Sequence, residues 1–113
     1  MIKLSVLIAQ QPPQSEFMEF AAKRLEGATK ITNDAKAKGG PAILTYHHFV
    51  VKLPYYEAAA SGAFNILEAK RELKNLLNEM CMLAGNVNMD QIHFQQLVGK
   101  IEVLGELIIK CEK

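Results

Sequence analysis

The sequence lacks most of the features that place a small protein in a specialised class. It has no tryptophan and only two cysteines, Cys81 and Cys111, which are too few for a disulfide framework. No apolar run approaches the roughly 18–20 residues that cross a bilayer. The formal net charge is +1, so no whole-protein attraction to nucleic acid or to an anionic membrane is encoded. We therefore expect a cytoplasmic protein with no membrane contact, no cofactor and reduced, buried thiols.

The size and composition are those of one ordinary globular domain. The chain has 113 residues, of which 50% are hydrophobic and 22% are charged, a balance typical of folded chains. A chain of this length can bury a core without disulfides or metals. We expect residues 1–113 to form a single helical domain.

Prolines and glycines divide the first half of the chain. Residues 2–9 are apolar and partly β-branched, and we expect a short extended arm there, although a strand or an extra helical turn would also fit. Two successive prolines end this segment. Ser15 then has the character of a helix N-cap. Apolar residues at helical spacing predict a helix from there to about Lys38, capped by Gly39.

Residues 43–53 are ambiguous between helix and strand. Their β-branched and aromatic composition favours a strand, but a single hairpin with residues 2–9 would be marginally stable. We favour a helix that starts near Thr45 and is kinked at Leu53-Pro54. A second short helical piece should follow and end at Gly62.

Two longer helices are predicted in the second half of the chain. In the first, over residues 64–84, the apolar side chains occupy an arc of roughly 160°, as in a helix buried on one side. Gly85 ends it. Asn88 and Gln91 have the spacing of a capping box for the second, over residues 89–112. These assignments predict an all-α fold, a four-helix bundle with a kinked second helix.

The last helix carries more apolar surface than one neighbour covers. Its apolar arc spans roughly 260°, and the polar residues Gln95, Glu102 and Glu106 occupy much of the remainder. Such a helix is either central in its domain or shared with another subunit. Because each helix of a four-helix bundle keeps one side in water, we expect a homo-oligomer. The residues that widen the arc form the predicted interface: Ile92, Val103, Leu107 and Ile109.

The densest cluster of hydrogen-bonding aromatic residues surrounds the predicted helix break. It comprises Tyr46, His47, His48, Tyr55, Tyr56 and Glu57. One interpretation is a binding patch or pocket, because sites concentrate at loops and breaks on a rigid scaffold. The other is that these amphipathic side chains anchor a kinked helix and keep their polar tips in water.

Other motifs are weak. Asp90 and His93 are one helical turn apart, which is chelating geometry, but no second such pair accompanies them, so we predict no metal site. The first long helix is locally basic, yet acidic residues interrupt its positive charge.

The leading functional hypothesis is a non-enzymatic, self-associating module that uses residues 89–112. The alternatives are a small-molecule or metal-assisted enzyme with a site near Tyr46–Glu57, and a weak nucleic-acid binder.

Overall fold

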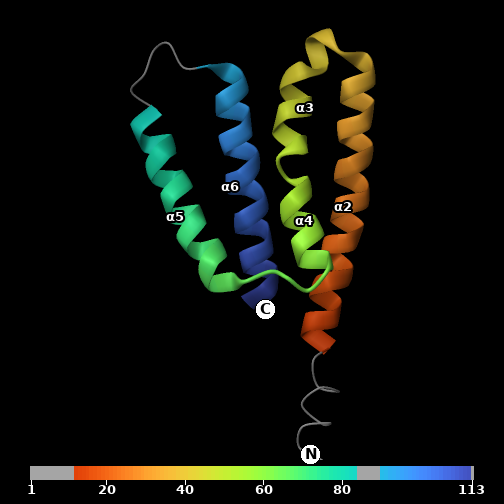
Figure 1. Cartoon of the computed structure of the whole chain (residues 1–113), viewed down its shortest axis with the longest axis vertical. Coiled ribbons are helices and arrows are strands. Elements are labelled where there is room, and N and C mark those ends of the chain that lie inside the picture. The colour runs from red at the N-terminus through yellow and green to blue at the C-terminus, as the bar shows by residue number, and fades with distance from the viewer. Residues whose placement is uncertain (1–11, 84–89, 113) are drawn as a thin grey trace, which may run out of the picture.

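A computed structural model describes the backbone of residues 12–83 and 90–112. Its helices are α2 (Pro12–Lys38), the short 3-10 helix η1 (Gly40–Ala42), α3 (Ile43–Val50), α4 (Leu53–Ala60), α5 (Ile66–Leu83) and α6 (Gln91–Glu112). The prediction of an all-α, four-helix bundle-like fold is confirmed, with α3 and α4 forming the broken second helix (Figure 1). The predicted arm at residues 2–9 and the predicted stop at Gly85 lie outside the described residues.

Helix α2 begins earlier than predicted. It starts at Pro12, so Ser15 lies inside the helix and is not its N-cap. Proline is well tolerated in the first turn of a helix, because its missing N–H has no intrahelical partner there. The predicted end is confirmed: Gly39 has a φ of 60° and donates its N–H to the carbonyl of Ala35 at 3.0 Å.

Residues 43–53 form a helix followed by a break, and the break lies slightly before the predicted position. Helix α3 ends at Val50, four residues before Pro54. A proline ring clashes with the carbonyl four residues earlier, so this proline ends α3 and takes its place in the first turn of α4. Lys52, in the break, donates its backbone N–H to Phe49 at 3.0 Å.

Side chains from single residues cap the last two helices. Asn65 Oδ1 accepts the backbone N–H groups of Leu67 at 3.0 Å and Glu68 at 3.1 Å, which sets the start of α5. Asp90 Oδ1 accepts the N–H of Ile92 at 3.0 Å at the start of α6. Asp90 therefore caps α6, whereas the predicted capping box relied on Asn88, which lies outside the described residues.

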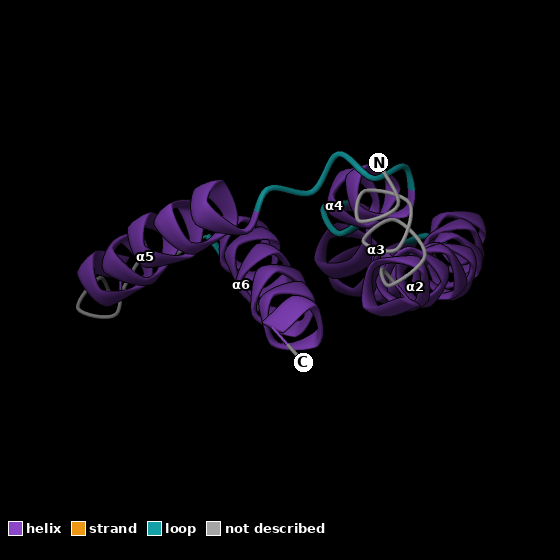
Figure 2. Cartoon of the chain, turned by 90° about the horizontal axis from the view of Figure 1, so that it is seen from below, coloured by secondary structure: helices purple, strands orange, loops and turns teal. Residues whose placement is uncertain are grey.

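Helix α6 occupies the middle of the structure. It packs against α5 on one side and against α2, α3 and α4 on the other (Figures 1 and 2). It contributes to two hydrophobic clusters, each lying on a different side of α6. The first contains Phe17, Ala21, Ala28, Tyr56, Ala59, Val103 and Leu107. The second contains Ala69, Leu76, Leu97, Leu104 and Ile108.

This central position accounts for much of the wide apolar arc of α6. Val103 and Leu107, which we predicted to lie at an intermolecular interface, have no exposed surface. That part of the prediction is wrong, because the two side chains fill the cluster between α6 and the α2–α4 pair. Ile92 is half-buried. Of the four predicted interface residues, Ile109 is the most accessible, with 61% of its surface exposed.

Candidate functional site

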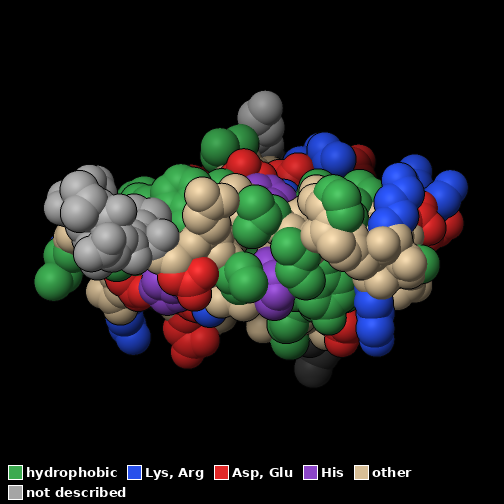
Figure 3. Space-filling view, turned by 90° about the horizontal axis from the view of Figure 1, so that it is seen from above, with side chains coloured by type: hydrophobic (Ala, Val, Ile, Leu, Met, Phe, Trp, Pro, Cys, Tyr) green, Lys and Arg blue, Asp and Glu red, His purple; other side chains and the backbone are tan. Residues whose placement is uncertain are grey.

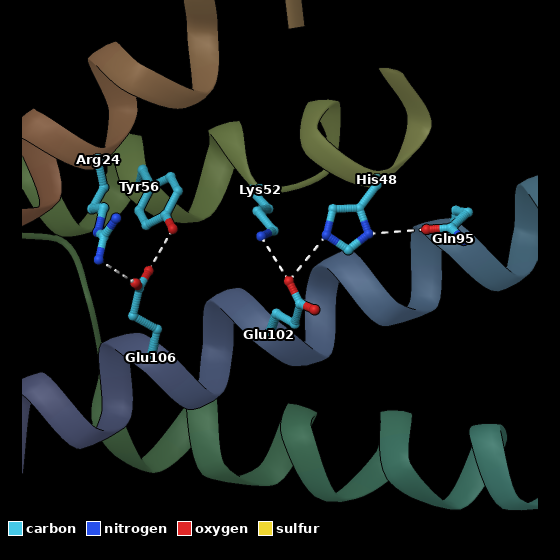
Figure 4. Close-up of polar contacts among 7 residues, drawn as sticks. All are labelled: Arg24, His48, Lys52, Tyr56, Gln95, Glu102 and Glu106. Carbon is cyan, nitrogen blue, oxygen red and sulfur yellow. Dashed lines mark hydrogen bonds and ion pairs between the residues drawn. The ribbon is translucent and has the colours of Figure 1, made fainter. Parts of the chain in front are cut away.

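A row of polar side chains on α6 faces the other helices. Gln95, Glu102 and Glu106 are spaced seven and four residues apart, so they share one face of the helix. This polar strip meets α3, α4, α2 and the break between α3 and α4, forming a polar seam between the two halves of the fold (Figure 4).

Glu102 is the centre of the first polar group along α6, which also contains Gln95, His48 and Lys52. One of its oxygens, Oε1, lies 2.9 Å from Lys52 Nζ and 3.0 Å from His48 Nε2. The other ring nitrogen of His48 lies 3.1 Å from Gln95 Oε1. Partial burial by itself raises the pKa of Glu102, but the hydrogen bonds and positive charge of Lys52 and His48 outweigh it, so the pKa is lowered.

Lys52 is a buried cation. Only 8% of its surface is exposed, and its ammonium group also lies 4.7 Å from the centroid of the Phe49 ring, within the range of a cation–π contact. Burying an unpaired ammonium group is strongly unfavourable. The carboxylate of Glu102 and the aromatic face of Phe49 explain how this position is tolerated.

Glycine allows the seam to close. A Cβ atom on Gly99 would overlap the backbone carbonyl oxygen of His48 and come within 2.8 Å of Val51 Cγ2. The end of α3 therefore lies directly on the backbone of α6. Any larger residue at this position would separate the helices and pull His48 away from Glu102.

A second polar group lies further along α6. Glu106 accepts a hydrogen bond at 2.5 Å from the hydroxyl of Tyr56 and lies 3.2 Å from Arg24 Nη2 (Figure 4). Desolvation by burial, followed by the hydrogen bond and charge of Glu106, raises the pKa of Tyr56. Tyr56 is therefore a hydrogen-bond donor at neutral pH, and α2, α4 and α6 are joined at one carboxylate.

The predicted aromatic and histidine patch does not form one pocket. Tyr55 donates its hydroxyl to Glu72 of α5, whereas His48 and Tyr56 turn toward α6. His47 Nδ1 contacts Gln96 at 3.2 Å, and Tyr46 packs edge-on against the His47 ring at 5.2 Å. The sixth predicted residue, Glu57, is exposed. Four of the six side chains, those of His47, His48, Tyr55 and Tyr56, therefore contact side chains of α5 or α6.

Sequence patterns alone did not identify the partners of this patch. Glu102 and Glu106 look like ordinary surface residues of an amphipathic helix. Their distinguishing feature is a stripe at positions 95, 99, 102 and 106 that combines polar side chains with a glycine on an otherwise apolar helix.

A space-filling view from above shows histidine side chains reaching the surface among hydrophobic ones at one end of the helices (Figure 3).

The residues considered for metal binding have structural roles. His93 Nε2 lies 3.2 Å from Glu79 Oε2 of α5, and Asp90 caps α6. Among the described residues, no group of three or more His, Cys, Asp or Glu side chains could hold a metal ion. Both cysteines are free and exposed. The prediction of buried thiols is therefore wrong: Cys81 and Cys111 lie in the last turns of α5 and α6, where fewer neighbouring side chains cover them.

A cleft lies beside the polar seam, between α2 and the α3–α4 segment. Its volume is about 210 Å³. The lining residues are Lys23, Arg24, Gly27, Ala28, Ile31, Phe49, Lys52, Tyr56 and Glu106. A second cleft, of about 270 Å³, lies between α4 and α5 beside Tyr55, with Glu68 and Glu72 as its charged lining residues.

Comparisons with protein-family models, with curated proteins and with solved structures gave no significant match. Among the described helices, none is long and apolar enough to cross a membrane.

Proposed function

We propose that this protein is a cytoplasmic, non-enzymatic interaction module that binds a second copy of itself through an open face of α5 and α6. We define the open face by four apolar residues: Leu77, Val98, Ile101 and Ile109. Leu77 is 45% exposed and Ile109 is 61% exposed, while Val98 and Ile101 are half-buried. The main packing partner of α5 is α6, so this side of the hairpin has room for another helix pair.

Two pairs of charged residues support placing Leu77 and Ile101 on one side of the hairpin. Lys70 Nζ lies 2.6 Å from Glu112 on one side of the helix pair, and Glu79 contacts His93 on the other. At 100° per residue, Leu77 lies about 20° from Lys70 on α5, and Ile101 lies about 20° from Glu112 on α6. Both apolar residues therefore belong to the Lys70–Glu112 side.

The observation that carries the proposal is the empty space at Gly105. This glycine is four residues from both Ile101 and Ile109, and a Cβ atom added to it would meet nothing within 4 Å. Glycine weakens a helix interior but lets another backbone approach closely. A matching stripe on a second copy is self-complementary under two-fold symmetry, and two such hairpins would pack as a four-helix bundle.

The alternatives have less support. An enzyme site near Tyr46–Glu57 would need those side chains to converge, whereas they turn toward different helices. In the basic helix α2, acidic residues such as Glu16, Glu26 and Asp34 interrupt the positive charge, which weakens its attraction for nucleic acid.

Light scattering over a wide range of protein concentration tests the proposal. We expect a dimer mass that falls to the monomer mass on dilution. Ile109→Lys and Leu77→Lys should give monomers with unchanged circular dichroism. The matched control is Ile43→Lys, because Ile43 is an exposed apolar residue (42%) on a different helix. A wild-type monomer at every concentration, or equal dissociation by Ile43→Lys, would overturn the proposal.

A further inference from the structure

The cleft between α2 and the α3–α4 segment has an excess of positive charge. Lys23, Arg24 and Lys52 line it together with one carboxylate, Glu106. The ammonium group of Lys52 is already paired with Glu102, so Lys23 and Arg24 are the cations that a ligand can reach. The cleft beside Tyr55 has the opposite character, since its charged lining residues are Glu68 and Glu72. The two clefts therefore suit ligands of opposite charge.

The cations of this cleft retain unused hydrogen-bonding capacity. A guanidinium group has five N–H donors, and the Arg24 contact with Glu106 engages one terminal nitrogen at 3.2 Å. Lys23 pairs with Glu19 at 3.9 Å, and both side chains are more than two-thirds exposed. An exposed pair at that distance is weak, so the Lys23 ammonium can turn toward a ligand.

The floor of the cleft is apolar and partly empty. Ala28, Ile31 and Phe49 provide aliphatic and aromatic surface. Gly27 lies in the interior of α2, where glycine is unfavourable, and a Cβ atom there would meet nothing within 4 Å. Packing explains Gly99 but does not explain Gly27, whose missing side chain instead adds open volume to the cleft.

We propose that this cleft binds a small organic anion, with a carboxylate or phosphate group held by Lys23 and Arg24. The apolar body of the ligand lies over Gly27 against Ala28, Ile31 and Phe49. Arginine suits this role because its planar donors match the oxygens of both anions. The volume of about 210 Å³ is below the roughly 300–1,000 Å³ of sites for drug-sized ligands, so the ligand is about the size of a substituted benzene ring.

Titration with small aromatic probes, followed by NMR chemical shifts, tests this site. Benzoate and phenyl phosphate carry the required charge, while benzyl alcohol and benzylamine are neutral and cationic analogues of similar shape. We expect saturable shifts at Gly27, Ala28 and Phe49 with the two anions. Equal affinity for benzyl alcohol would overturn the proposal, because the cations would then contribute nothing.

Three variants locate the binding. Gly27→Leu fills the floor without opposing the helix, and Lys23→Gln removes one charge at the rim. Lys23→Gln should weaken benzoate and phenyl phosphate binding roughly tenfold, the loss expected for a hydrogen bond to a charged group. Gly27→Leu should weaken both by occupying the space of the ligand's ring. The control is Lys30→Gln, an exposed lysine on the same helix that does not line the cleft. Full binding by Gly27→Leu, or equal losses in Lys23→Gln and Lys30→Gln, would contradict the proposed site.

Discussion

The backbone of Gly99 lies directly against the carbonyl oxygen of His48, so α3 and α6 meet without an intervening side chain. This contact brings His48 and Lys52 within hydrogen-bonding distance of Glu102. The polar seam therefore depends on a residue that has no side chain.

Gly99→Ala should destabilise the fold although alanine favours helix. The gain in helix propensity is about 1 kcal/mol, but the added methyl group must displace the backbone of α3. Overpacking of this kind costs roughly 1–3 kcal/mol, so we expect a lower free energy of unfolding in chemical denaturation. Gly105→Ala is the matched control on the same helix, and at low protein concentration it should stabilise the protein. An unchanged or raised stability of Gly99→Ala would show that α3 can move away freely.

Stability should fall in acid partly because of Glu102. Its pKa in the folded protein is lowered from the ordinary value of 4.5. The group therefore adds stability above pH 4.5, and this contribution is lost as the pH falls through the lowered pKa. Glu102→Gln should flatten the acid limb of a plot of unfolding free energy against pH. Glu57→Gln, at an exposed position on α4, is the control, and an equal flattening there would remove the specific role of Glu102.

The two tyrosine–glutamate hydrogen bonds should differ in strength. Tyr56→Phe leaves the partly buried Glu106 without its phenol donor, and we expect a loss of about 1–2 kcal/mol. Tyr55→Phe should cost less, because the bond to Glu72 is exposed and water can replace the donor. Thermal denaturation of the two variants compares them, and a greater loss in Tyr55→Phe would reverse this ranking.

Alkaline pH should weaken the contribution of Tyr56. Its folded pKa lies above the ordinary value of 10.0, so its stabilising effect is complete below pH 10 and is lost as the pH rises through the folded value. Titration of the phenolate absorbance should show ionisation above pH 10 in the native protein. If Tyr56 instead ionised with the ordinary pKa of 10.0 while the protein remained folded, the contact with Glu106 would be absent in solution.

Lysine should disrupt the fold at one position of α6 and leave it nearly unchanged at another. Val103 has no exposed surface, so Val103→Lys places a charge in the core and should abolish cooperative unfolding. Ile109→Lys lies on an exposed position and should change the stability of the monomer by less than about 0.5 kcal/mol. A folded Val103→Lys protein would show that this side of α6 is not covered in solution.

Both thiols should react in the native protein. Cys81 and Cys111 are exposed, so a soluble thiol reagent should modify both without denaturant, as counted by intact mass. Slow modification of either cysteine, with rapid reaction after unfolding, would show that its thiol is covered.

Several features follow from the sequence because their causes are local. The left-handed turn at Gly39 and the break before Pro54 depend on backbone sterics within a few residues. The β-branched and aromatic residues of 43–53 fit either a helix or a strand, so composition alone does not fix the structure of this segment. There the proline and the lack of an evident partner strand correctly favoured a helix.

The sequence alone was enough to predict the all-α fold of the described residues, the end of α2 at Lys38 and the one-sided burial of α5. Tertiary structure alone decided which neighbours cover α6. Helical periodicity reports which residues share a face, but it does not show whether water or another helix meets that face. Glu102 and Glu106 face partners about 50 residues away in the chain, and Val103 and Leu107 are buried because α2 and α4 fold back onto α6. Those contacts depend on the whole chain, so a polar strip that resembles a solvent face became a seam, and half of a predicted interface became core.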